Sequence, residues 1–322
     1  MSHSPTRGGV NKLGERGIRA FYYEGLEGLK KTGWVDRVSG TIFDSDQEVE
    51  DYHGLGHVPT MRESKNGRNA EQLRHFNYEL RNIDYDATVR IKKREMKRDK
   101  VGLIRRRLTD LAATGQKHWA SLLSSLMING ESAQCYDKKM FFAENHQEGK
   151  SPVQSNLIDA DDYPAFNVAD PADPTAAELM KVFMKGIQHL YSLKDDQNEP
   201  ANEDAMKFLA FVPISMWGES YTTVSSKNLA VAGGGNQDNP LPQAEFSLDI
   251  IPNPRLTFET DLVLAIDDGR SFIRQEEEET DLVILGEDSD HYYFNKEIMV
   301  SAESTRSAGY GLWRSCCKIQ LS

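Results

Sequence analysis

The feature that most constrains the fold is a long amphipathic stretch at residues 96–129. Its apolar positions recur every three or four residues, which predicts one continuous helix with a buried stripe. At a rise of ~1.5 Å per residue this helix would be about 45 to 50 Å long. Asn129-Gly130 is typical of a helix end, and Gly115 predicts a bend or a close packing contact. The stripe consists of Ile104, Leu108, Leu111, Gly115, Trp119, Leu122 and Leu126.

Charge is concentrated in two blocks of opposite sign. Residues 90–107 hold ten basic and two acidic residues, and residues 276–290 hold eight acidic and no basic residues. Blocks of this kind can attract copies of one chain to each other, although two solvated faces without a partner would give the same pattern. Basic residues at the start of a helix oppose its dipole, which favours an external contact. The candidate intersubunit contacts are Arg90, Lys92, Lys93, Arg94, Lys97, Arg98, Arg105, Arg106, Arg107, Glu276, Glu277, Glu278 and Glu279.

Composition excludes several classes of protein. The 322 residues, 39% of them hydrophobic, are enough for one large or two modest domains with a core. The formal net charge of -12 disfavours a dedicated nucleic-acid binder. No apolar run reaches the ~18 to 20 residues of a membrane span, and the polar N-terminal segment lacks the apolar core of a signal peptide, so we expect folding in a cytoplasm. Cys135, Cys316 and Cys317 have neither disulfide-framework nor zinc-site spacing, and we expect buried free thiols.

The first part of the chain predicts two extended segments. Residues 1–43 are glycine-rich, which disfavours a compact helix and predicts an arm anchored on another surface by apolar side chains such as Phe21 and Trp34. Residues 44–95 predict a long two-stranded excursion. Within it, Ala87, Val89 and Ile91 alternate with polar residues, as in a half-buried strand.

The second half predicts a mixed, strand-rich arrangement of the α+β class. We expect a helix at 175–193 capped by Thr175, a buried strand at 207–213, a helix at 214–225 and a loop at 230–242. Further strands are predicted at 244–252, 255–259, 261–267, 271–275, 281–286, 291–304 and 311–321.

No combination of residues converges on catalysis or on a cofactor. His53 and His57 are separated by glycines and lack a third metal ligand, and the aspartates at 159–162 lack the glycine and glutamate of a calcium loop. Gly233–Gly235 lacks the lysine of a phosphate-binding loop. His146 is the one residue that invites a catalytic interpretation, but the sequence FFAENH is also typical of a structural joint. We therefore expect no catalytic, metal-binding or cofactor-binding residues.

Several segments together resemble one family. DYHGLGHVPTMRE, LRHFNYELRN and DYDATVRIKKREMKRDKVG are similar to the gpT family of major head proteins of phage Mu and Mu-like phages. YDKKMFFAENHQEG followed by SNLI, then FLAFVPISMW and IIPNPRLT, are similar to later parts of that family. SAGYGLWRSCCKIQL is similar to the closing strand of many tailed-phage capsid proteins. The similarity extends in order from about residue 30 to the end.

The resemblance implies an α+β, Hong Kong 97-like capsid fold. Its expected parts are an N-terminal arm (1–43), an extended loop (44–95), a peripheral domain (96–165) with a spine helix (96–130), an inserted axial domain (166–284) and C-terminal strands completing the peripheral domain (285–322). It implies a non-enzymatic capsid subunit of a tailed phage virion, assembled in the host cytoplasm as hexamers and pentamers. Expected partners are double-stranded DNA on the inner face without sequence specificity, portal, scaffold and decoration proteins, and no membrane.

Two alternatives and one expectation accompany this interpretation. An encapsulin-type compartment would share the fold but would enclose cargo instead of DNA. A soluble hydrolase would use His146 with a carboxylate and would be a small monodisperse species. Because the arm spans only about 43 residues, we expect that it holds no cleaved scaffolding segment.

Overall fold

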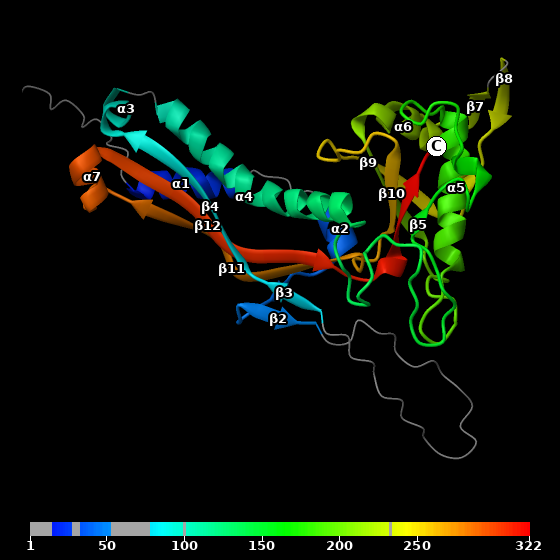
Figure 1. Ribbon diagram of the computed structural model, residues 1–322. Helices are drawn as coiled ribbons and strands as arrows, with labels where there is room; N and C mark the ends of the chain where they lie inside the picture. Colours follow the sequence, from blue (N-terminus) through cyan, green and yellow to red (C-terminus); the bar gives the residue numbers. More distant parts are fainter. Residues whose placement is uncertain (1–14, 28–32, 53–77, 99–100, 232–233) are drawn as a thin grey trace, which may run out of the picture. The chain divides into compact units, whose positions relative to one another are not determined.

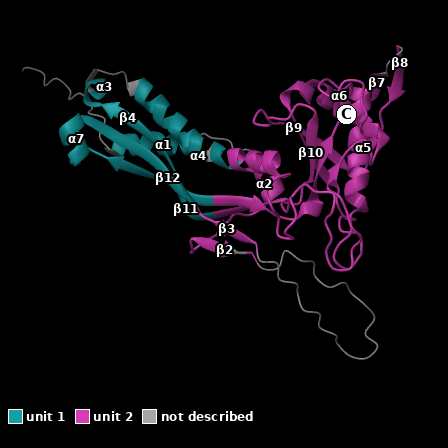
Figure 2. Ribbon diagram, viewed as in Figure 1, with its two compact units in different colours: residues 1–32, 83–119, 276–306 teal, residues 33–82, 120–275, 307–322 magenta. Residues whose placement is uncertain are grey.

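The computed structural model describes residues 15–27, 33–52, 78–98, 101–231 and 234–322. The chain forms two compact units, shown in Figure 2. Unit 1 comprises residues 1–32, 83–119 and 276–306, and unit 2 comprises residues 33–82, 120–275 and 307–322. The units are interleaved along the sequence, and their limits differ from the expected domain limits at 43, 95, 165 and 284.

The centre of unit 1 is an antiparallel pair of long strands. β4 (Ile83–Lys92) pairs with β12 (Glu297–Tyr310) over ten positions, from Ile83 opposite Arg306 to Lys92 opposite Glu297. β11 (Phe272–Leu285) lies on the other side of β12 and connects to it through the short helix α7 (Asp290–Asn295), as Figure 1 shows. The predicted half-buried strand is confirmed, because Ile91 is fully buried and Thr88, Arg90 and Lys92 are exposed.

Two helices pack on the inward face of this sheet. α1 (Glu15–Glu27) and α4 (Val101–Asn129) contribute Ile18, Tyr22 and Leu108 to the core that Ile91 and Leu282 complete. The predicted extended arm is therefore wrong for residues 15–27. Gly25 serves close packing in this helix: a Cβ there would lie 2.9 Å from the Cα of Thr109 in α4.

The predicted long helix is present with a different beginning. Helix α3 (Lys93–Arg98) precedes α4, and residues 99–100 between them lie outside the described residues. The predicted end at Asn129 is confirmed. Ile104, Leu108, Leu111 and Trp119 are buried as predicted, but in the last turns Leu123 and Met127 are fully buried where Leu122 and Leu126 were expected. A strict seven-residue spacing drifts around a straight helix, which accounts for this shift.

The contact predicted at Gly115 is confirmed. A Cβ there would lie 3.2 Å from the Cγ2 of Thr280 on β11. The missing side chain therefore lets helix α4 and strand β11 approach closely within unit 1.

Unit 2 is built on a five-stranded mixed sheet. The order is β5 (Leu157–Ile158), β13 (Cys316–Gln320), β10 (Asp261–Ile266), β6 (Lys207–Val212) and β9 (Ser247–Pro252). β10 is antiparallel to both β13 and β6, whereas β6 is parallel to β9 and β13 is parallel to β5. The C-terminal strand β13 thus pairs with a strand of the expected axial segment, a pairing that the domain expectation did not include.

The predicted helices of the second half are confirmed. α5 (Ala176–Ser192) begins after Thr175, whose hydroxyl and the Glu178 carboxylate form a capping box. α6 (Trp217–Ser225) follows the 3-10 turn η2 (Ile214–Met216). In α5, Gly186 is packed against the side chains of Ile319 and Leu264, so the helix lies directly on the sheet.

Several other elements differ from the prediction. Residues 255–259 are not a strand, because the Asn253 side chain accepts a hydrogen bond from the backbone N–H of Arg255 at 3.0 Å and holds a turn. The expected loop at 230–242 contains a hairpin of β7 (Asn228–Val231) and β8 (Gly235–Asp238). The strands predicted at 271–275 and 281–286 form one strand, β11, and residues 291–295 belong to helix α7.

The two-stranded excursion is confirmed only in part. β2 (Val49–Asp51) and β3 (Glu79–Arg81) form an antiparallel pair in unit 2, but β4 belongs to the sheet of unit 1. Two further short elements, α2 (Val35–Ser39) and β1 (Phe43–Asp44), lie in the predicted arm and at the start of the excursion. Residues 53–77, with His53 and His57, lie outside the described residues.

Candidate assembly surface and buried polar centres

All the predicted basic contact residues belong to unit 1. Arg90 and Lys92 lie on the exposed face of β4, opposite the face that carries Ile91. Arg94 on α3 and Arg105, Arg106 and Arg107 on α4 are also exposed, and Lys93 is half-buried. Lys97 and Arg98 are in α3, but their side chains are outside the described part of the structure. The structure therefore brings the basic run together on one unit.

Some of these cations have partners in their own chain. Arg105 forms an ion pair with Glu24 of α1, and Arg107 lies 3.5 Å from Glu95. The Nζ of Lys93 lies 5.1 Å from the centre of the Tyr292 ring, and a hydrogen bond with Tyr292 raises the pKa of Lys93. Exposed ion pairs contribute roughly 0 to 1 kcal/mol, so these contacts leave the basic surface available to a stronger partner.

The four glutamates of β11 do not share one environment. Glu276 forms an ion pair with Arg306 at 3.0 Å, with 12% and 2% of the two side chains exposed. Glu277, Glu278 and Glu279 are exposed. Glu276 was expected at an intersubunit contact, and the structure instead places it in a buried ion pair. Glu276 shares one side of β11 with Thr280, and the guanidinium of Arg306 contacts both of these side chains.

Arg306 is a buried structural residue that the sequence interpretation missed. Its guanidinium also donates to the Thr280 hydroxyl and lies 4.8 Å from the centre of the Trp119 ring. Its inward register on β12, shared with Val300 and Ala302, would have been the signal. A buried arginine needs this set of partners because an unpaired buried charge is strongly destabilising.

His146 lies in a closed polar centre of unit 2. Its Nδ1 is 2.6 Å from the Asp137 carboxylate, and its Nε2 is 3.2 Å from the Asn156 side-chain oxygen. The ring stacks on Trp313 at 4.2 Å with an interplanar angle of 5°. The side chain is fully buried and both nitrogens are engaged, so this arrangement can hold a joint but cannot reach a substrate. The structural interpretation of FFAENH is supported.

A second buried centre adjoins it. The Glu148 carboxylate lies 2.6 Å from Arg314, and the indole N–H of Trp313 donates to it at 2.7 Å. The Tyr136 hydroxyl also donates to Glu148, and burial together with that carboxylate raises the pKa of Tyr136 well above its ordinary value. These contacts join residues 136–148 to residues 313–314, a link that sequence spacing does not reveal.

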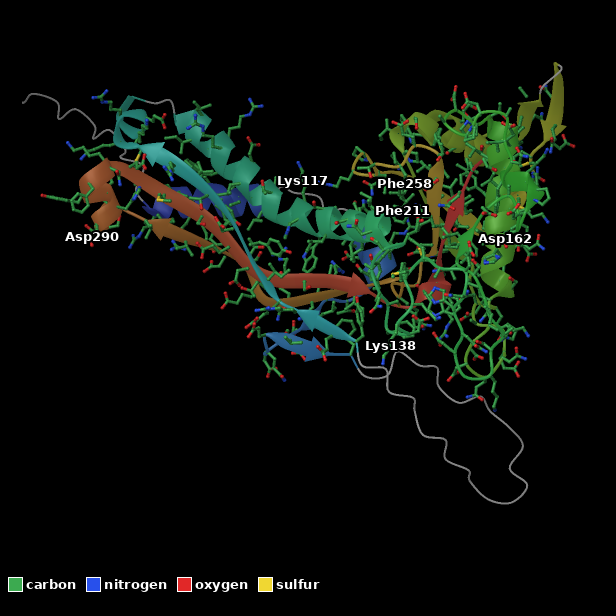
Figure 3. The ribbon with its side chains drawn as sticks, viewed as in Figure 1. Lys117, Lys138, Asp162, Phe211, Phe258 and Asp290 are labelled. Atoms are coloured by element: carbon green, nitrogen blue, oxygen red, sulfur yellow. The ribbon has the colours of Figure 1, made fainter. Side chains whose placement is uncertain are left out.

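A third centre surrounds Lys318 on β13. Its ammonium group lies 2.7 Å from Asp261, forms an ion pair with Glu131, and is 4.7 Å from the centre of the Phe258 ring, which is labelled in Figure 3. Burial lowers the pKa of Lys318, but the two carboxylates raise it by more, so the pKa lies above its ordinary value. The Lys318 ammonium group thus links β13 to the first residue of β10 and to Glu131, which follows α4.

The remaining candidates do not form a site. The described residues contain no group of three or more His, Cys, Asp or Glu side chains placed to bind a metal ion. Asp159 and Asp161 instead form a local turn, with the Asp161 N–H donating to Asp159 at 2.8 Å. The predicted buried free thiols are confirmed for all three cysteines, and burial raises the pKa of Cys135 and Cys316. Of the helices in the described ranges, none combines the length and hydropathy that a membrane crossing requires.

Comparison with known proteins identifies relatives among phage capsids. The major capsid protein of Escherichia phage Mu is 22% identical over 129 residues, which are 38% of this chain and 42% of that protein. The match thus spans less than half of the Mu protein. The procapsid of bacteriophage JBD30 has a TM-score of 0.52 and 15% identity, covering 95% of this chain and 73% of that one. The mature capsid of bacteriophage PhiM1 has a TM-score of 0.53 and 11% identity, covering 100% and 92%.

These structural similarities concern the fold. They confirm the predicted α+β, Hong Kong 97-like class. The family model for the Mu-like prophage major head subunit gpT matches residues 12–175, just over half of the 322 residues. This chain therefore belongs to the Mu-like gpT major head subunit family.

Proposed function

We propose that the chain is the major capsid protein of a tailed double-stranded DNA phage, and that its copies assemble as hexamers and pentamers into the icosahedral head. The observation that carries the proposal is the match to the gpT head-subunit family over residues 12–175, which includes the expected extended loop and the long helix. The proposal keeps the expected peripheral and axial domains with corrected limits: residues 83–119 and 276–306 of unit 1 belong to the peripheral domain, and residues 166–275 with 307–322 of unit 2 belong to the axial domain.

A shell subunit works by contacts with several neighbours that are individually weak and are summed by geometry. In the proposal, the part of the expected loop (44–95) that precedes β4 lies across an adjacent subunit, and the basic run at 90–107 meets acidic surface of that subunit. The exposure of Arg90, Lys92, Arg94 and Arg106 on one unit supports this step. Glu277, Glu278 and Glu279 are exposed carboxylates of the same chain that could receive them.

The proposal assigns no enzymatic activity to the chain. The burial of His146 between Asp137, Asn156 and Trp313 supports a structural role for the residue most suggestive of catalysis. A general base must come within hydrogen-bond reach of the proton that it abstracts, and a fully buried ring with both nitrogens engaged has no such access.

The proposed partners follow from the same role. The subunit contacts portal, scaffold and decoration proteins, encloses double-stranded DNA without reading its sequence, and belongs to the virion after assembly in the host cytoplasm. With a net charge of -12, any contact with phosphate must come from local basic surface, and it should weaken as salt rises.

Size-exclusion chromatography followed by electron microscopy tests the proposal. Full-length chain from phage-producing cells should elute as closed particles that contain DNA. Particles with protein cargo and no DNA would favour an encapsulin-type compartment instead. A small monodisperse species whose hydrolytic activity is lost in His146→Ala would replace the proposal with an enzyme.

A further inference from the structure

Two aromatic side chains are exposed side by side at one end of unit 1. Tyr293 and Phe294 on α7 are each 78% exposed, the largest exposures among bulky apolar side chains in the described residues. Their rings meet edge to face, with centroids 5.3 Å apart. We call this pair the aromatic tip. Single exposed apolar residues are ordinary, but adjacent exposed aromatic rings are typical of an interaction site.

Hydrogen bonds within unit 1 stabilise α7, the short helix that carries the aromatic tip. The Ser289 hydroxyl accepts a hydrogen bond from the Tyr292 N–H at 3.2 Å, and Lys296 closes the helix in the left-handed conformation, with its N–H 2.8 Å from the Tyr292 carbonyl. The Tyr292 hydroxyl donates to Glu287 at 3.0 Å, and His291 lies 3.1 Å from Glu297. The two rings are therefore presented on a pre-organised support, which lowers the entropic cost of binding.

Charges of both signs flank the tip. Glu287, Asp288 and Asp290 precede or begin α7, where Figure 3 labels Asp290. Lys93 of α3 is adjacent, because its backbone N–H donates to the Lys296 carbonyl at 2.9 Å and its ammonium lies over the Tyr292 ring. The next residue, Arg94, is exposed. An aromatic centre with a charged rim is the usual anatomy of a protein interface.

We infer that the aromatic tip docks on the tip of a second copy of this chain, with the acidic residues of one copy against Lys93 and Arg94 of the other. Because one end of one unit carries both signs, two identical ends can be complementary to each other across a symmetry axis. The inference rests on the proposed function and deepens it by naming a contact between copies.

Truncating the tip tests its contribution. The double variant Tyr293→Ser/Phe294→Ser should leave the thermal unfolding of the isolated chain unchanged, because both side chains are exposed, and should lower the yield of particles ~tenfold or more. The matched control Tyr293→Phe/Phe294→Tyr keeps both rings and should give the yield of the natural sequence. Equal particle yields from the serine variant and the control would overturn the inference.

Cross-linking identifies the occupant. Phe294→Cys in assembled particles should form covalent dimers of the chain under mild oxidation, because the native cysteines are buried. Val153→Cys, at a side chain 61% exposed in unit 2, serves as the control and should remain monomeric. A disulfide from the introduced thiol to a different protein, or no disulfide at all, would contradict a second copy as the occupant.

The two proposals can fail separately. If the natural sequence forms no shell, the proposed function fails whatever the tip variants do. If it forms shells and Phe294→Cys yields no dimers, the inference about the tip fails while the capsid function stands.

Discussion

Arg306 on β12 and Glu276 on β11 form an ion pair at 3.0 Å, with only 2% of the arginine side chain exposed. The pair lies where Arg306 also contacts Thr280 and the Trp119 ring, within the sheet and helix of unit 1. The ion pair joins the side chains of β11 and β12, whose backbones are also joined by the hydrogen bonds of the sheet. The stability of this unit should therefore depend on both partners.

Removing one partner should be far more damaging than removing both. Glu276→Ala leaves a buried guanidinium without its carboxylate and should lower the free energy of unfolding by about 3 to 5 kcal/mol. The double variant Glu276→Leu/Arg306→Met should lower the free energy of unfolding by much less, because it leaves no unpaired buried charge. Urea unfolding measures both, with the exposed Glu279→Ala as the control expected within about 0.5 kcal/mol of the natural sequence. A loss from Glu276→Ala no larger than that of the control would contradict the assignment.

Two helical glycines should respond oppositely to alanine. A Cβ on Gly186 of α5 would lie 2.7 Å from Ile319 Cδ1 and 3.0 Å from Leu264 Cδ2, so Gly186→Ala should destabilise by about 1 to 3 kcal/mol. Gly218 of α6 has nothing within 4 Å of that position, and Gly218→Ala should be neutral or stabilising by up to about 1 kcal/mol. Thermal unfolding compares the two. A stable Gly186→Ala variant would mean that α5 does not lie so closely on the sheet.

His189 should make stability depend on pH. Burial lowers the pKa of His189 below its ordinary value of 6.5, although the Ser155 carbonyl and the Asp162 carboxylate oppose the shift. As the pH falls below 6.5, the unfolded chain takes up a proton that the folded chain resists, so stability falls through that window and is fully present above it. His189→Gln should flatten the decline in stability below pH 6.5. Identical pH profiles for the two proteins would exclude this role.

The exposed basic run should matter for assembly and not for folding. Reversing Arg105, Arg106 and Arg107 to glutamate breaks exposed ion pairs with Glu24 and Glu95 and the contact of Arg105 with the Phe21 ring. Exposed contacts of this kind contribute little to stability, so the isolated chain should remain folded. Particle yield should fall steeply. Reversing Lys138, Lys139 and Lys150, three exposed lysines of unit 2, changes the net charge equally and serves as the control. A normal particle yield from the arginine variant would show that this basic surface is not needed for assembly.

Periodicity predicted the elements whose residues contact one continuous apolar surface. Local spacing determines which side chains face inward. It correctly predicted the helical stripe from Ile104 to Trp119 and the strand alternation that ends at Ile91. The helix cap at Thr175, which was predicted from residue type, is also confirmed. The glycines of residues 15–27 misled the prediction. Glycine suits both an extended arm and a close helix contact, and only the position of Thr109 beside Gly25 distinguishes them.

The buried polar centres could not be predicted from spacing. Glu148 and Arg314 are separated by 166 positions in the chain, and His146 and Trp313 are nearly as distant. The partner of a buried charge is set by tertiary packing, which a single sequence does not encode as a local pattern. The candidate surface was predicted as a set of charges. The structure leaves Glu277, Glu278 and Glu279 exposed, as it does most of the described cations, and places Glu276 in a buried ion pair.

A cryo-electron-microscopy reconstruction of particles purified with this chain tests whether it forms the phage head. We expect closed icosahedral shells in which every subunit position, around five-fold and six-fold centres alike, has density that fits unit 1 and unit 2 of this chain. A folded chain that remains monodisperse under assembly conditions, or shells whose wall density fits neither unit, would contradict this expectation.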